Sequence, residues 1–144
     1  EGEKEACNCG GHGCLEQVAS ATGIARTARR MLAADSRPSS LRSLKNISAK
    51  NVLDAAKAGD ELALDSLNKS CYYLGWVLAT LSMVVDPQAY IIGGGVSKAG
   101  TFLTDMIKKY HDELSPMATK KADIVLAKLG NDAGIYGAAK LILG

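Results

Sequence analysis

The sequence has few aromatic residues, little excess charge and no long apolar run. Its 144 residues include one Phe and one Trp, and 17 basic residues stand against 15 acidic ones, for a formal net charge of +2. A surface that binds nucleic acid normally carries a marked positive charge and aromatic rings for base stacking. We therefore expect no nucleic-acid partner.

A secretory signal and a membrane-spanning segment are also lacking. Residues 1–5 are mostly acidic, whereas a signal peptide begins with basic and then apolar residues. The apolar run Cys71–Val85 is shorter than the roughly 20 residues that a spanning helix needs. We therefore expect a cytoplasmic protein with no membrane partner. The first residue is Glu rather than Met, so we expect a processed chain or a part of a longer one.

A cluster of cysteines is the first positive signal. Cys7, Cys9 and Cys14 lie among glycines and just before an expected helix. Glycines let the backbone fold tightly around an ion, and a helix N-terminus favours the thiolate that binds metal. Without a secretory signal, this spacing favours a metal over a disulfide or free thiols.

The number of ligands in this cluster is one short of a structural zinc site, which takes four in a tetrahedron. His12 is the nearest further candidate, but it lies inside a very short loop. His111 and Cys71 each have a simpler interpretation, as an exposed helix residue and a core thiol respectively. The fourth ligand could also lie before Glu1.

Hydrophobic periodicity predicts five helices and two short strands. Ser48 and Asp60 are expected to begin two of the helices as N-caps, and Gly59 to end the first of these. The longest helix is apolar on several faces beyond Cys71, so we expect it to be buried on several sides. The expected helices cover about 14–33, with Gly23 as a weak point, then 48–58, 60–85, 103–114 and 132–143, the expected strands cover 89–92 and 124–127, and residues 35–47 are expected to form a loop.

The order of strand, glycine turn, helix and strand is that of a parallel βαβ unit, which places the chain in the α/β class. The first strand, Ala89–Ile92, is a short apolar run and is expected to be buried. Because two strands rarely form a stable sheet, we expect further strands upstream. Gly93–Gly95 follow at the carboxyl end of the strand, where open sheets bind ligands, although a tight turn alone also explains them. They do not form a Walker loop.

The cysteine cluster and three further segments resemble one known family. The pattern Cys7-x-Cys9-Gly10-x-x-Gly13-Cys14-x-Glu16 resembles the zinc signature of the ROK family (repressors, open reading frames and kinases). The similar segments are residues 14–24, CLEQVASATGI, which are like the glucokinase branch, residues 91–97, which are like the family's adenosine segment, and residues 129–139, which are like its closing helix.

This resemblance implies an actin-like, ribonuclease-H-like ATPase fold, of which residues 1–144 would be a helix-rich C-terminal portion with its upstream strands missing. The closing helix would cover 132–143. The zinc loop, at residues 7–14, would hold a structural Zn²⁺ on its three cysteines, with an upstream His as the fourth ligand. The catalytic Asp and the phosphate-binding loop would also lie upstream, so no catalytic residue is expected in this chain and the chain alone is expected to be inactive.

The resemblance also implies roles for individual residues. Glu16 would bind the sugar, although a first-turn Glu stabilised by the helix dipole is the plain structural alternative. Gly94 and Gly95 would contact the adenosine of ATP. Lys98, Asp132 and Tyr136 have simpler interpretations, as a solvent-facing side chain, a helix cap and a core residue respectively.

The expected function is ATP-dependent phosphorylation of a hexose in the presence of Mg²⁺, with conversion of glucose to glucose 6-phosphate as the expected reaction. A homodimer is expected. The alternative is a sugar-sensing repressor of the same family, with a DNA-binding part upstream. A complete zinc-binding module is a third possibility, which the missing fourth ligand and the thin sheet disfavour.

Overall fold

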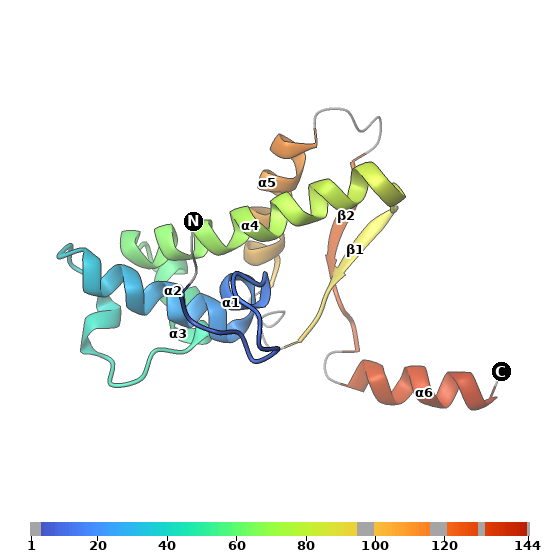
Figure 1. The fold of residues 1–144 in the computed structure, drawn as a ribbon, viewed down its shortest axis with the longest axis horizontal. Coiled ribbons are helices and arrows are strands. Elements are labelled where there is room, and N and C mark those ends of the chain that lie inside the picture. Colours follow the sequence, from blue (N-terminus) through green and yellow to red (C-terminus); the bar gives the residue numbers. More distant parts are fainter. Residues whose placement is uncertain (1–3, 95–99, 116–120, 130–131, 144) are drawn as a thin grey trace.

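The computed structural model describes residues 4–94, 100–115, 121–129 and 132–143. The elements follow one another as α1 (Glu16–Ala19), α2 (Ala21–Ala34), η1 (Ser40–Ser43), α3 (Ala49–Lys57), α4 (Glu61–Val85), β1 (Ala89–Ile92), α5 (Thr101–Leu114), β2 (Asp123–Leu126) and α6 (Ala133–Leu143). Helices α1 to α5 pack into one body, and the strand pair β1–β2 and the helix α6 extend from its side (Figure 1). The core lies between α2, α3, α4 and α5. Its large members include Ile24, Leu41, Val52, Leu53, Leu67, Leu78, Leu103, Ile107 and Ile124.

Two helices, α1 (Glu16–Ala19) and α2 (Ala21–Ala34), replace the single helix predicted over 14–33. The chain turns at Ser20, whose ψ of 172° is extended and whose Oγ accepts a hydrogen bond of 3.0 Å from the Gly23 N–H. The prediction was wrong because apolar periodicity continues across Ser20, while the serine caps a new helix. Gly23 is a contact point rather than a weak point, since a Cβ there would lie 2.7 Å from the Glu16 carbonyl oxygen.

The next elements begin and end where their capping residues predict. A 3-10 turn, η1 (Ser40–Ser43), lies in the expected loop and is followed by α3 (Ala49–Lys57) and α4 (Glu61–Val85). Ser48 forms a capping box with Asn51, and the Asp60 carboxylate accepts from the Ala63 N–H at 3.1 Å. Gly59 adopts a φ of +89°, which only glycine tolerates readily. The predicted N-caps and stop are confirmed.

Helix α5 (Thr101–Leu114) packs closely against α4. A Cβ at Gly75 of α4 would lie 2.6 Å from the Cβ of Tyr110, so glycine is what lets the two helices approach. Cys71 is buried in this packing, as predicted, with 2% of its surface exposed. His111 is fully buried, so its interpretation as an exposed helix residue was wrong.

Strands β1 (Ala89–Ile92) and β2 (Asp123–Leu126) pair in parallel, with Ala89 opposite Asp123 and Ile92 opposite Leu126. The predicted βαβ unit is therefore confirmed, with α5 as its crossover helix. The expectation that β1 is buried was wrong, because exposed and half-buried residues alternate along it and Ile91 is 70% exposed. Helices of the described chain cover only one face of the strand pair.

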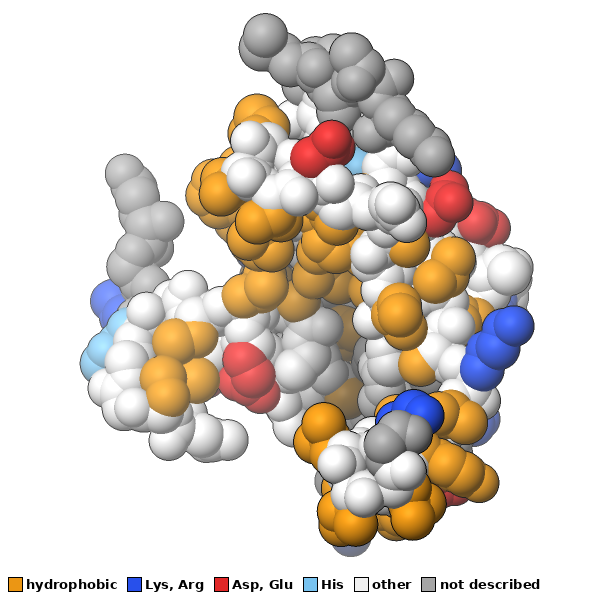
Figure 2. Space-filling view, turned by 90° about the vertical axis from the view of Figure 1, so that its right-hand side faces the viewer, with side chains coloured by type: hydrophobic (Ala, Val, Ile, Leu, Met, Phe, Trp, Pro, Cys, Tyr) orange, Lys and Arg blue, Asp and Glu red, His pale blue; other side chains and the backbone are white. Residues whose placement is uncertain are grey.

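Helix α6 (Ala133–Leu143) follows β2, as predicted, but every one of its residues is exposed. Tyr136 is 60% exposed, so its interpretation as a core residue was wrong. Figure 2 shows hydrophobic side chains gathered around this helix at the bottom of the view. Helix α4 packs against α1, α2, α3 and α5, as expected of a central helix, but its C-terminal half also has an uncovered face, where Trp76 is 53% and Val84 76% exposed. Among the described residues, no helix has both the length and the apolar character needed to cross a membrane.

Candidate functional site

The cysteines of the zinc loop (residues 7–14) lie together in space. The Sγ atoms of Cys7, Cys9 and Cys14 are all within 4.8 Å of one another, and those of Cys9 and Cys14 are 3.5 Å apart. Tetrahedral coordination with zinc–sulfur bonds of about 2.3 Å places two sulfurs about 3.8 Å apart. The three thiols therefore fit a single zinc ion.

The backbone of the zinc loop explains how so short a segment brings three sulfurs together. The Cys7 N–H donates to the Gly11 carbonyl at 2.7 Å, and the Gly10 N–H donates to the Cys7 carbonyl at 2.8 Å. Gly10 and Gly13 have φ values of +85° and +70°, so glycine permits both turns. His12 is exposed and does not join the cluster. The described part of the chain thus supplies three ligands, and a fourth before Glu1 stays a prediction.

The protonation of the free thiols shows how tightly they are packed. A hydrogen bond from the Gly11 backbone lowers the pKa of Cys9, whereas the hydrogen bond with Cys9 raises the pKa of Cys14 to about 11. Three thiolates at this spacing need a cation to compensate their charge, which agrees with the fit of a metal ion.

Gln17 braces the zinc loop, a role that we did not predict. It is 5% exposed, its Oε1 accepts from the Cys14 N–H at 3.2 Å, and its Nε2 donates to the Glu5 carbonyl at 2.9 Å. Arg26 in turn donates to the Gln17 carbonyl and to the Glu5 carboxylate. Leu15 is the N-cap of α1, so the bond from the Cys14 N–H to Gln17 is not a capping box and no sequence pattern pointed to it.

The Glu16 carboxylate is fixed directly beside the zinc loop. Its Oε1 accepts from the hydroxyls of Ser20 and Thr22, each at 3.1 Å, and the Cys7 Sγ donates to its Oε2 at 3.6 Å. The bonds from Thr22 and Ser20 hold the pKa of Glu16 below its ordinary value. The carboxylate is therefore charged, oriented and exposed, which are the properties needed to accept hydrogen bonds from a ligand's hydroxyls.

The glycine turn after β1 is described as far as Gly94, and Gly95 and Lys98 lie outside the described residues. Gly94 has a φ of +78°, and a Cβ placed there would meet none of the described residues within 4 Å. The turn thus needs glycine for its conformation. Asp132 is exposed and directly precedes α6, and its role as a helix cap stays a prediction.

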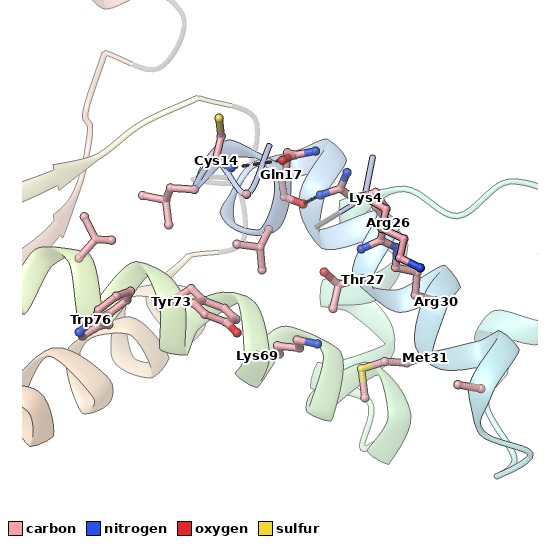
Figure 3. Close-up of a pocket in the computed structure, with 15 residues that line it drawn as sticks. Lys4, Cys14, Gln17, Arg26, Thr27, Arg30, Met31, Lys69, Tyr73 and Trp76 are labelled. Atoms are coloured by element: carbon pink, nitrogen blue, oxygen red, sulfur yellow. Dashed lines mark hydrogen bonds between the residues drawn. The ribbon is translucent and has the colours of Figure 1, made fainter. Parts of the chain in front are cut away.

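A groove of about 840 Å³ lies between α2, α4 and the zinc loop. Arg26 and Arg30 of α2 line one side, and Tyr73 and Trp76 of α4 line the other (Figure 3). Glu16 and Gly94 are not among the lining residues. Leu15 and Gln17, on either side of Glu16 in the sequence, do line it, so the groove adjoins the segment that carries the candidate sugar contact.

The sequence profile of the ROK family matches residues 1–144. The chain belongs to the ROK family. It is 41% identical to a glucokinase of Halalkalibacterium halodurans over 94% of this chain and 42% of that protein. The chain thus spans less than half the length of this curated relative.

Solved ROK structures have the same fold. A ROK glucokinase of Streptomyces griseus, solved in complex with glucose and AMPPNP, superposes with a TM-score of 0.83 at 34% identity, over 96% of this chain and 47% of that one. A ROK transcriptional regulator superposes with a TM-score of 0.69 at 31% identity, over 88% of this chain and 32% of that one. The predicted family and its actin-like fold are confirmed.

Proposed function

We propose that the protein is an ATP-dependent hexose kinase and that glucose is its substrate. The observation that carries this proposal is the fixed, ionised carboxylate of Glu16 beside the zinc loop. Such a carboxylate can accept hydrogen bonds from two neighbouring sugar hydroxyls and so orient the ring. The similarity to proteins named glucokinase supports glucose among the hexoses.

In this proposal the remaining site residues have separate tasks. Cys7, Cys9 and Cys14 hold a structural Zn²⁺ that stabilises the loop beside Glu16. Gly94 and Gly95 contact the adenosine of ATP. Mg²⁺ supplies charge neutralisation on the ATP phosphates. The catalytic base, an Asp, lies outside these 144 residues, in a region that corresponds to the part of the longer relatives that this chain does not cover.

The proposal includes the setting of the enzyme. An ATP-consuming enzyme with free cysteines belongs in the cytoplasm, where thiols stay reduced. The exposed apolar side chains of α4 support a homodimer, because a second copy would cover them. Hexose and ATP are then the small-molecule partners, and neither nucleic acid nor a membrane takes part.

The test is Glu16→Gln in the whole protein, measured by steady-state kinetics with each substrate varied. Replacing a charged acceptor by a neutral amide costs about 1.5–3 kcal/mol, so the KM for glucose should rise roughly tenfold or more while the KM for ATP changes less than about twofold. Glu113→Gln, at an exposed position on α5, is the matched control. An equal rise in both KM values would refute a sugar contact at Glu16.

A sugar-sensing repressor is the second candidate, favoured by the similarity to a ROK transcriptional regulator. The two candidates differ in the step that sugar binding triggers. A repressor would bind DNA and change its DNA affinity with sugar, without phosphorylating the sugar. A DNA mobility-shift assay and an ADP-release assay on the same preparation therefore separate them.

A further inference from the structure

A chain of partly buried hydrogen bonds connects β1 to α4 and α5. The Tyr90 hydroxyl, on β1, donates to the Leu78 carbonyl of α4 at 2.8 Å and lies 3.1 Å from the Ser82 hydroxyl. Ser82 lies 2.9 Å from Nε2 of His111, whose Nδ1 lies 3.0 Å from the Asp112 carboxylate. Three elements that are far apart in sequence are thus joined through side chains.

The direction of these bonds follows from the charge on Asp112. Partial burial acts to raise the pKa of Asp112, but hydrogen bonds from His111 and Lys108 outweigh it and lower the pKa overall. An ionised carboxylate only accepts, so Nδ1 of His111 donates to it. The single proton of the Tyr90 hydroxyl goes to the Leu78 carbonyl, so a continuous chain requires Ser82 to donate to Tyr90 and to accept from Nε2 of His111.

The series Ser82, His111 and Asp112 has the order of a nucleophile, base and carboxylate, but no substrate can reach it. His111 is 0% and Ser82 6% exposed. The Tyr90 and His111 rings also pack edge to face, with centroids 5.8 Å apart. The arrangement therefore holds structure in place and performs no chemistry.

What the chain of bonds holds is the strand that leads into the glycine turn. Helices of the described chain cover only the face of β1 that carries Tyr90 and Ile92. Ile92 contributes apolar packing, which is not directional, whereas the Tyr90 hydroxyl makes directional bonds to α4. Gly93 and Gly94 follow immediately, so a shift of β1 along its axis would move the turn by the same amount.

We propose that Tyr90, Ser82 and His111 are positioning residues that fix the glycine turn for nucleotide binding. The inference rests on the proposed function, because it takes the turn to be the adenosine contact. These three residues would affect nucleotide affinity without touching the nucleotide, because they act on the strand that leads into the turn.

The test compares Tyr90→Phe with Tyr110→Phe in the whole protein. Each variant keeps its ring and loses one half-buried hydroxyl, since Tyr110 donates to Asn68 of α4 at 3.1 Å, away from β1. Tyr90→Phe should raise the KM for ATP and the Kd of a non-hydrolysable ATP analogue roughly three- to tenfold. The KM for the sugar should stay within about twofold in both variants. Equal effects of the two substitutions on nucleotide affinity would overturn the proposal.

Amide hydrogen exchange provides a readout that does not depend on nucleotide binding. Exchange at residues 92–94 should become faster in Tyr90→Phe and remain unchanged in Tyr110→Phe. Unchanged exchange in Tyr90→Phe would also overturn the proposal. If the unaltered protein bound no nucleotide, the proposed function would fail, while a selective change in exchange would still show that the hydrogen bonds fix the turn.

Discussion

At the scale of single residues, each of the three thiols of the zinc loop is needed as a metal ligand, because the described residues offer only these three. Cys9→Ser replaces a soft sulfur by a hydroxyl that binds zinc poorly. We expect the purified variant to contain far less than one metal ion per chain, as measured by elemental analysis, and to melt at a lower temperature. Cys71→Ser is the control, because this buried thiol lies outside the cluster and its loss should lower stability without releasing metal. Stoichiometric metal in Cys9→Ser would disprove the site.

Gln17 matters at the same scale, through the two backbone groups that it satisfies. Gln17→Leu leaves the Cys14 N–H and the Glu5 carbonyl without these partners, at a cost of about 1–3 kcal/mol. Groups that orient metal ligands typically account for about 10- to 100-fold in affinity, so competition with a chelator should show weaker zinc binding. Gln88→Leu, at an exposed position before β1, should leave the affinity unchanged. Equal zinc affinity in both variants would show that the bracing is dispensable.

At the scale of elements, the junction between α1 and α2 depends on the missing side chain of Gly23. Gly23→Ala would place a Cβ 2.7 Å from the backbone of Glu16 and Gln17, so the two helices must separate. We expect a loss of about 1–3 kcal/mol in the free energy of unfolding, measured with denaturant. Gly134→Ala in α6 is the matched control, because a Cβ there meets nothing within 4 Å. A neutral Gly23→Ala would mean that the junction can relax.

The cap of α4 predicts a pH dependence. Burial acts to raise the pKa of Asp60, but hydrogen bonds from the Ala63 N–H and from Ser40 and Ser39 outweigh it and lower the pKa. A lowered folded-state pKa stabilises the fold above the ordinary Asp value of about 4, and this contribution is lost as the pH falls further. Asp60→Asn should therefore lose less stability than the unaltered protein between about pH 5 and pH 2. Asp105→Asn, at an exposed position on α5, should behave like the unaltered protein. Parallel pH profiles for all three would contradict this assignment.

Local sequence signals predicted where helices begin and end better than they predicted which residues are buried. Ser48, Asp60 and Gly59 act through hydrogen bonds and dihedral angles within a few residues, so the sequence reveals them. The burial of His111 and the exposure of Tyr136 depend on which elements pack against them, which periodicity does not report.

The contacts of the candidate site likewise include some that the sequence predicts and some that it does not. The clustering of three cysteines follows from their spacing, and the geometry agrees with that prediction. The role of Gln17 and the hydrogen bonds from Ser20 and Thr22 to Glu16 depend on the turn between α1 and α2. The apolar pattern continues across that turn and predicts one helix there, so these contacts could not be predicted.

At the scale of the whole molecule, apolar side chains remain uncovered on α4 and α6. Leu141 and Ile142 are 90% and 85% exposed, and Val84 is 76% exposed. Large apolar side chains exposed in number usually meet another protein surface. The thin β1–β2 pair, covered on one face by the described helices, agrees with a need for further structure beside it.

The resemblance to ROK kinases leads to a prediction about the activity of residues 1–144. Residues 1–144 purified alone should bind zinc but show no hexose-dependent ATP turnover in a coupled ADP assay, because the resemblance places the catalytic Asp outside them. The whole protein, assayed under the same conditions, is the positive control. Turnover by residues 1–144 that Glu16→Gln abolishes would show that the catalytic base is present among them.

The contacts that hold the zinc loop also set an order of assembly. Glu5, Gln17 and Arg26 lie at most 21 residues apart, whereas the β1–β2 pair joins Ala89 to Asp123. Short closures cost less chain entropy and form faster than long ones. During synthesis the zinc loop also leaves the ribosome first. We therefore expect metal capture to precede formation of the β1–β2 pair, so that a nascent chain already holds its ion before it has a second strand to pair.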